Sequence, residues 1–126
     1  MKVKIDTKEK FHTITIEDVE LSANMTVELD EKLLFYTNEA VNNVVLDMMN
    51  VSSIDEQAAE RLALIQQAFY DKNCSFVICK LQMEVEKLLD KMDLLEILNV
   101  TPTESEAWDI VQMEEIEREL IWSVKL

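Results

Sequence analysis

Two short segments near the start of the chain alternate between apolar and polar residues. Val3 and Ile5 are separated by polar residues in KVKIDTK, and the same spacing separates Ile14 and Ile16 in HTITIED. Side chains of a strand point alternately to its two faces, so this pattern is typical of strands with one buried face. We therefore expect a hairpin that turns near Glu9–Lys10 and forms one edge of a sheet.

The remainder of the chain alternates between helical and strand-like spacing of apolar residues. Continuous apolar runs at 44–46 and in SFVICKL predict strands that are covered on both faces. Helical spacing predicts helices over 24–39, 56–71 and 85–92 and from 103 onward, and LNV at 98–100 is expected to be a short strand. This order predicts an α/β fold in which helices pack on a mixed sheet whose later strands are parallel.

The last predicted helix carries more apolar residues than one core-facing stripe needs. Thr103 and Glu106 stand three residues apart at its start, as in a capping box. We treat residues 1–111 as the folded domain and residues 112–126 as a helix end and apolar tail within that same single domain. We expect Trp122 and its neighbours to be buried, either against the domain's own surface or against a second copy in a homodimer; a frayed end is the alternative.

The composition narrows the range of functions. The chain has 126 residues, the size of one domain, and its 26 acidic and 12 basic residues leave a net charge of −14. Such a charge repels phosphate backbones and anionic lipid, so we expect neither nucleic acid nor a membrane surface as direct partner. No segment is apolar enough for membrane insertion or a signal peptide, so a cytoplasmic protein is expected.

Few residues are suited to catalysis or to metal binding. His12 is the only histidine, and its strand suggests a surface or edge position. Cys74 and Cys79 are five residues apart, which on a strand directs them to opposite faces, so we expect two reduced, half-buried thiols. Glycine is absent, which excludes a glycine-rich phosphate loop and leaves turns to Asn, Asp and Ser, as at 42–43, 71–73 and Asn99. We expect no catalytic residues, cofactor or metal, and so not an enzyme.

The segment LSANMTVELDEKLLFYTNEAVNNVVLDMMNVSSIDEQAAERLALIQQAFYDKNCSFVICKLQMEVEKLLDKMDLLEIL resembles the STAS domain. This family includes bacterial anti-sigma factor antagonists and the cytoplasmic tails of sulphate transporters. The likeness extends from Lys2 to Val111 and rests on the element order, the VVLDM strand, the position of Asp55 and the third helix before LLEIL. It implies a STAS-like mixed β-sheet with helices packed against it.

The resemblance also implies a regulatory position at the start of the second helix. In the antagonists, the loop ends in Asp-Ser-Ser-Gly or Asp-Ser-Thr-Gly, and a partner that is both anti-sigma factor and kinase phosphorylates the first serine. Here Asp55 matches the aspartate, Glu56 takes the place of the phosphorylated serine, and Gln57 and Ala58 follow. Glu56 is either a helix-starting carboxylate or a permanent negative charge in place of a reversible one. Ser52 and Ser53 remain as alternative hydroxyls.

By this resemblance, we expect a regulatory protein-interaction module that docks an anti-sigma factor or another kinase-fold protein. The loop and helix around 53–61 would form the contact. The expected partner-binding residues are Ser53, Asp55, Glu56, Gln57, Glu60 and Arg61. Two alternatives come from the same family: a STAS subunit or adaptor of a membrane transport system, and a small-ligand sensor. The acidic surface and the lack of glycine argue against nucleotide phosphates as the ligand.

Overall fold

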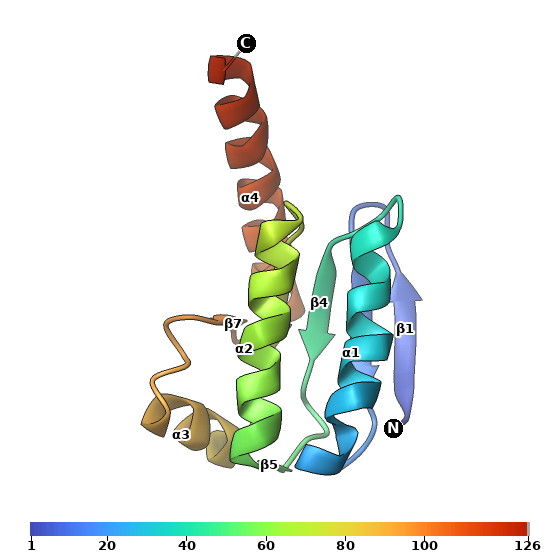
Figure 1. The fold of residues 1–126 in the computed structure, drawn as a ribbon, viewed down its shortest axis with the longest axis vertical. Helices are drawn as coiled ribbons and strands as arrows, with labels where there is room; N and C mark the ends of the chain where they lie inside the picture. Colours follow the sequence, from blue (N-terminus) through green and yellow to red (C-terminus); the bar gives the residue numbers. More distant parts are fainter. Residues whose placement is uncertain (126) are drawn as a thin grey trace.

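A five-stranded mixed sheet forms the centre of the computed structural model, which describes the backbone of residues 1–125 and the side chains of residues 1–121 (Figure 1). In spatial order the strands are β1 (Val3–Thr7), β2 (His12–Ile16), β4 (Val44–Asp47), β6 (Phe76–Cys79) and β7 (Asn99–Thr101). β1 is antiparallel to β2, and all other neighbours are parallel. The predicted α/β fold, the mixed sheet and the edge hairpin are confirmed.

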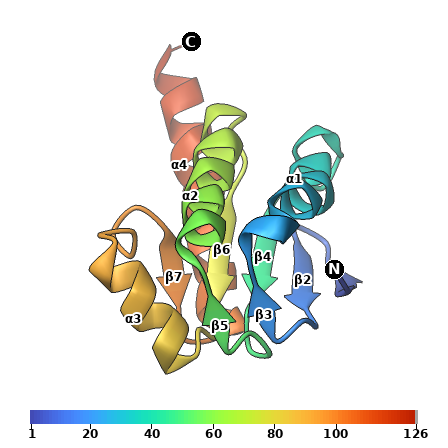
Figure 2. The same cartoon turned by 60° about the horizontal axis from the view of Figure 1, so that its bottom comes forward.

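Helices cover both faces of this sheet (Figures 1 and 2). One face carries α1 (Thr26–Leu34), α2 (Glu56–Asp71) and α3 (Met83–Lys91), and the other carries α4 (Glu104–Lys125). Two short 3-10 helices, η1 (Ala23–Met25) and η2 (Phe35–Asn38), flank α1. A separate two-stranded sheet pairs β3 (Glu20–Leu21) with β5 (Ser53–Ile54).

Each face of the sheet has its own apolar core. Val44 and Leu46 of β4 contribute to the larger core beneath α1, α2 and α3, whereas Val45 between them contributes to the smaller core beneath α4. The smaller core also contains Ala107 and Val111 of α4. Because alternate side chains of a strand enter different cores, these strands need apolar residues at every position, as the continuous apolar runs predicted.

Two helix ends show how the chain turns without glycine. Asn73 after α2 and Asp93 after α3 have left-handed backbone conformations, with φ of 60° and 58°. At each end a backbone N–H reaches back five residues, from Cys74 to Phe69 and from Leu94 to Leu89, both at 2.9 Å. These are Schellman-type caps, in which Asn and Asp replace the usual glycine because they tolerate this conformation best among the other residues.

Several details differ from the predictions made from the sequence. The helix expected over 24–39 is divided into η1, α1 and η2, and the hydroxyl of Thr37 donates to the Leu34 carbonyl at 2.7 Å where the 3-10 turn replaces the α-helix. The paired strands β3 and β5 were not expected. Asn99 is not a turn residue, because it begins β7 and pairs with Val77 of β6.

His12 and both cysteines are more buried than expected. His12 is 8% exposed because β2 lies between β1 and β4 rather than at the sheet edge. Cys74 and Cys79 are fully buried rather than half-buried, and they do belong to opposite cores, as their spacing predicted.

The C-terminal part of α4 extends beyond the other elements (Figure 1). The division expected between residues 111 and 112, between the folded domain and its tail, falls inside α4, because this helix is continuous across it. Leu120 and Ile121 are exposed, so the expected burial against the domain's own surface is wrong for these two residues. The reason is that this part of α4 extends past the end of the sheet. The side chains of Trp122, Val124 and Leu126 lie outside the described residues.

Candidate partner-binding site

Asp55 organises the start of α2. It is the N-cap residue, and its Oδ1 accepts the backbone N–H of Ala58 at 2.9 Å. Its Oδ2 accepts the backbone N–H of Ala23, at the start of η1, at 2.8 Å. Asp55 is therefore the N-terminal cap of α2. Both of its oxygens are engaged within the domain, which leaves it less available to a partner than its exposed position suggests.

The loop before Asp55 is held by the residues that precede η1. The backbone N–H of Ser52 donates to the Val19 carbonyl at 2.8 Å, and its hydroxyl donates to the same oxygen at 3.2 Å. Ser53 lies in β5 and is exposed. Since the Ser52 hydroxyl already has an acceptor within the domain, Ser53 is the more accessible hydroxyl of the two.

The first two turns of α2 present a polar surface. Glu56, Gln57 and Glu60 are exposed, whereas Ala58 and Leu62 on the other side of the helix are completely buried. Glu56 is the first helical residue, directly after the cap, where the free N–H groups of the helix favour a negative charge.

Arg61 continues this surface toward α1. Its guanidinium forms an ion pair with Asp30 of α1 at 3.1 Å, and both side chains are about one-third exposed. Leu64, one turn further along α2, is 60% exposed and adds an apolar contact point next to the polar residues. The α2 surface is defined here as Ser53, Glu56, Gln57, Glu60, Arg61 and Leu64. The sequence did not point to Leu64, because this residue lies outside the apolar stripe of α2. It also did not predict the ion pair between Arg61 and Asp30.

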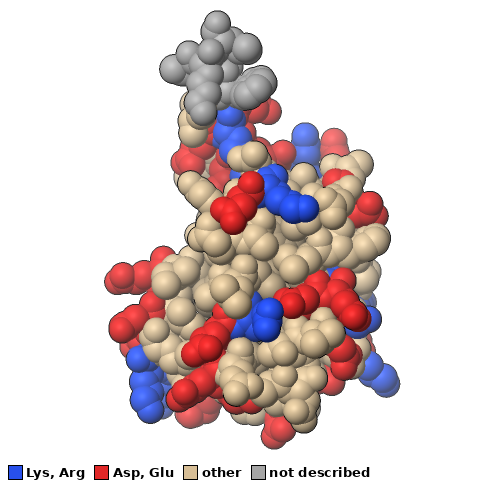
Figure 3. Space-filling model, viewed as in Figure 1, with Lys and Arg blue, Asp and Glu red and all other residues tan. Residues whose placement is uncertain are grey.

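Exposed apolar side chains also lie near the start of α3. Met49 and Met83 are exposed, and the side-chain amide of Gln82 donates to the Met49 carbonyl at 2.8 Å, which joins their two loops. On the face that carries α1, α2 and α3, uncharged side chains cover wide areas between clusters of acidic ones (Figure 3). A protein partner could therefore combine apolar and polar contacts on this face.

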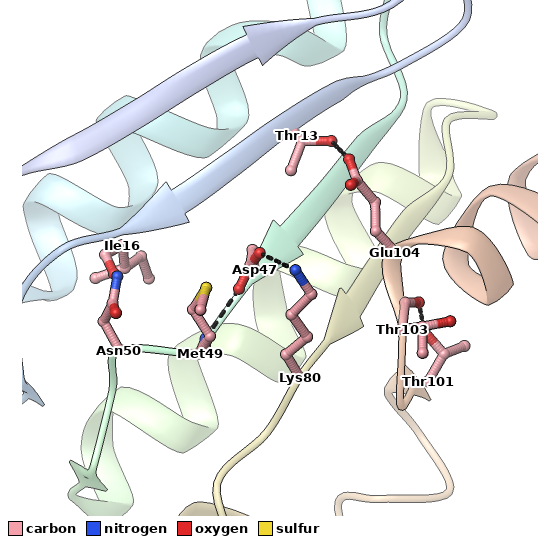
Figure 4. A network of polar contacts seen from close by, with 9 residues as sticks. All are labelled: Thr13, Ile16, Asp47, Met49, Asn50, Lys80, Thr101, Thr103 and Glu104. Carbon is pink, nitrogen blue, oxygen red and sulfur yellow. Dashed lines mark hydrogen bonds and ion pairs between the residues drawn. The ribbon is translucent and has the colours of Figure 1, made fainter.

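A polar network lies at the carboxyl ends of β4 and β6 (Figure 4). The nearly buried Asp47 carboxylate accepts the Met49 N–H at 2.9 Å and pairs with the Lys80 ammonium at 3.1 Å. This hydrogen bond raises the pKa of Lys80. Near it, the Thr13 hydroxyl donates to the carboxylate of Glu104 in α4. Asp47 thus marks the polar end of β4, and its charge is balanced within the domain by Lys80.

Both ring nitrogens of His12 have polar partners within the domain, and both thiols are buried. The Nδ1 of His12 lies 3.0 Å from the Thr7 hydroxyl, and its Nε2 lies 2.8 Å from the Val41 carbonyl. Burial raises the pKa of Cys74, and burial with the nearby Asp47 carboxylate raises that of Cys79 to about 12. Both thiols are therefore protonated at neutral pH and are poor nucleophiles.

Within the part of the chain that the structure describes, no group of three or more His, Cys, Asp or Glu side chains is arranged to hold a metal ion. Among the same residues, no helix combines the length and the apolar character that crossing a membrane requires.

Comparisons with known proteins identify relatives of this fold. The family model of the STAS domain matches residues 4–107. A Thermotoga maritima protein assigned as an anti-sigma factor antagonist has a TM-score of 0.74 at 18% identity, over 87% of this chain and 94% of that one. A search of curated proteins found no significant match.

Two further solved structures share this fold. RsbS from Moorella thermoacetica, with a serine replaced by glutamate, has a TM-score of 0.73 at 20% identity, over 94% of this chain and 99% of that one. The Bacillus cell fate determinant SpoIIAA in its phosphorylated form has a TM-score of 0.63 at 14% identity, over 87% of this chain and 99% of that one. At these identities the solved structures establish a shared fold.

Proposed function

This chain belongs to the STAS domain family, and we propose that it is a regulatory protein-interaction module that docks an anti-sigma factor or another kinase-fold protein through the α2 surface. The observation that carries the proposal is the position of Glu56. It is exposed, follows the cap Asp55 directly, and stands where the resemblance puts the phosphorylated serine of the antagonists.

Glu56 would act as a permanent charge at a position that relatives charge reversibly. A phosphoserine carries about −1.5 to −2 charges and three acceptor oxygens, whereas a glutamate carries one charge and two oxygens, so the replacement is a partial mimic. Two of the solved structures similar to this chain carry such an added charge: SpoIIAA is in its phosphorylated form, and RsbS has glutamate in place of a serine.

A permanent carboxylate also restricts the partner. In the antagonists, as the family resemblance implies, the added phosphate breaks the interface with the kinase. A partner of this chain must instead accept Glu56 at all times, together with Glu60 on the next turn. We therefore expect the partner to present Lys or Arg opposite these two carboxylates, which also suits the net charge of −14.

The other roles that the resemblance implied stay as proposals of lower rank. A transport-system subunit or adaptor would use the same domain, and the expected homodimer through the C-terminal tail is compatible with any of these roles. A cytoplasmic location and the absence of enzymatic activity are also part of this proposal.

Affinity capture with matched baits tests the proposal. The full chain, a Gln57→Arg/Glu60→Arg variant and a Tyr70→Ser control would each be used on lysate of the native cell. Tyr70 is exposed near the other end of α2, so its replacement leaves the start of the helix unchanged. Any captured protein would then be purified, identified and titrated against the three baits.

The proposal predicts a kinase-fold protein that binds the full chain and the Tyr70→Ser control equally. Its dissociation constant should rise about tenfold or more with Gln57→Arg/Glu60→Arg, because Glu60→Arg turns an attraction into a repulsion and Gln57→Arg adds a second positive charge beside it. Equal binding to all three baits would exclude the α2 surface. Recovery of a transporter ATPase in place of a kinase-fold protein would favour the transport alternative.

A further inference from the structure

The helix α4 has a second apolar stripe that the fold does not use. Its core side is formed by Ala107 and Val111, which are completely buried. Met113, Ile116 and Leu120 form the second stripe, with spacings of three and four residues, and they are 60%, 56% and 61% exposed. We call these three residues the α4 stripe.

Helix geometry places the α4 stripe opposite the core. Nine residues separate Ala107 from Ile116, and nine separate Val111 from Leu120, which corresponds to two and a half turns. The two sets therefore point in opposite directions from the helix axis. The surplus of apolar residues noted in the sequence of this helix is thus explained, because one side of the helix packs on the core and the other faces away from the sheet.

The surroundings of the α4 stripe are strongly acidic. Residues 104–121 contain seven acidic residues and one basic residue, Arg118. Arg118 donates to the Ser75 hydroxyl at 3.2 Å and so points toward the domain. Asp109 and Glu117 lie one turn from Met113 on either side and are exposed.

The flank of α4 next to the β1–β2 hairpin is acidic as well. A hollow of about 330 Å³ lies there, lined in part by Trp108 and Ile116. It also contains the acidic residues Glu9, Glu115 and Glu119, and one base, Lys10. An incoming basic side chain would therefore meet an excess of carboxylates beside the apolar stripe.

We propose that the α4 stripe is a docking site for a basic amphipathic helix of a partner protein. Leucine-like side chains of that helix would pack on Met113, Ile116 and Leu120, and its Lys or Arg residues would pair with the flanking carboxylates. This site is separate from the α2 surface and does not depend on the proposed function.

Charge distinguishes this occupant from a second copy of the chain. Two α4 helices packed stripe to stripe would bring their acidic flanks together, and this part of the helix has no outward-facing basic residue among those described to offset the repulsion. A basic helix removes the same repulsion and replaces it with attraction. We therefore favour a basic partner over the homodimer expected from the sequence.

A defined peptide tests the proposal on the full chain. The probe is a dye-labelled synthetic helix with a leucine stripe and lysines at its other positions, and the control peptide has the same composition in a scrambled order without a stripe. Binding is measured by fluorescence anisotropy to the full chain, to Ile116→Ser/Leu120→Ser and to a Val27→Ser control. Val27 is an exposed apolar residue of α1, on the other face of the sheet.

The full chain should bind the striped peptide about tenfold more tightly than the scrambled one, and the Val27→Ser control should keep this preference. Ile116→Ser/Leu120→Ser should lose it while circular dichroism and the melting temperature stay unchanged. Equal binding of the two peptides would show that only unspecific charge attraction acts, and absence of binding would show that the α4 stripe is not a docking site for a basic helix. Either result would overturn the proposal. Sedimentation that finds a dimer of the full chain, but a monomer of the double variant, would assign the stripe to a second copy and overturn the proposal.

Discussion

The Asp55 carboxylate accepts the backbone N–H of Ala23 and thereby joins the start of η1 to the start of α2. Its other oxygen caps α2 through Ala58, so one side chain fixes both elements that border the proposed binding surface. The exposed residues of this surface, Glu56 above all, therefore project from a backbone that the cap holds in place.

Replacement of Asp55 by alanine should lower the free energy of unfolding by about 1–3 kcal/mol, because a helix cap and a second hydrogen bond are lost together. Asp55→Asn should have an intermediate effect, since its amide oxygen can accept one N–H and its NH₂ group cannot accept the other. Urea unfolding of the three proteins measures this order. An Asp55→Ala variant as stable as the original would mean that the two bonds contribute nothing net.

Asp93 offers a gain in stability. This residue follows α3 with a φ of 58°, a conformation that costs a residue with a Cβ atom more than it costs glycine. We expect Asp93→Gly to raise the free energy of unfolding by about 0.5–1 kcal/mol and Asp93→Ala to lower it. Thermal melting of both variants provides the check, and a lower melting temperature for Asp93→Gly would contradict the expectation.

Cys79 should make the stability depend on alkaline pH. Its folded pKa of about 12 lies above the ordinary value of 9.0, so folding favours the protonated thiol. The stabilisation is fully present below about pH 9 and is lost as the pH rises toward 12, because the unfolded thiol ionises first. Lys80 contributes in the same direction, since its pKa is also raised.

A comparison with Cys79→Ala isolates the thiol. The melting temperature of the original protein should fall more steeply above about pH 9 than that of the variant, even though the variant melts lower throughout because of the cavity it creates. Parallel pH profiles for the two proteins would show that the thiol does not contribute.

Replacing side chains by alanine should affect stability differently on the two sides of α4. Val111→Ala removes two buried methyl groups from the smaller core and should cost about 1–2 kcal/mol in unfolding free energy. Ile116→Ala removes an exposed side chain and should change stability by less than about 0.5 kcal/mol. Chemical denaturation distinguishes the two, and a large loss in Ile116→Ala would reveal a contact of this face that the single chain does not show.

Phosphorylation should fail at the start of α2. A purified kinase-type partner with ATP should leave residue 56 unlabelled, since a glutamate has no hydroxyl, and we expect little label elsewhere in the chain. Glu56→Ser should gain the label, because it restores an exposed hydroxyl at a helix N-terminus. Mass spectrometry locates the phosphate, and stoichiometric label on Ser52 or Ser53 of the original protein would show that the switch lies earlier in the loop.

The order and type of the main elements could be predicted from the sequence because they depend on local patterns. Continuous apolar runs marked β4 and β6, since strands covered on both faces need apolar residues at every position. The bounds of α2 were predicted well because Asp55 is a strong cap and the apolar stripe ends with the helix at Asp71. The resemblance to the STAS family, which also rests on this order, identified the fold.

The tertiary structure alone determined which distant residues meet. Asp55 and Ala23 are 32 positions apart, Arg61 and Asp30 are 31 apart, and Lys80 and Asp47 are 33 apart. No local pattern encodes these contacts, because they depend on how the helices and strand ends pack around the sheet. The burial of His12 followed from the strand placed on each side of it. Similarly, the position of α4 against the second face decided which of its two apolar sides became core and which remained exposed.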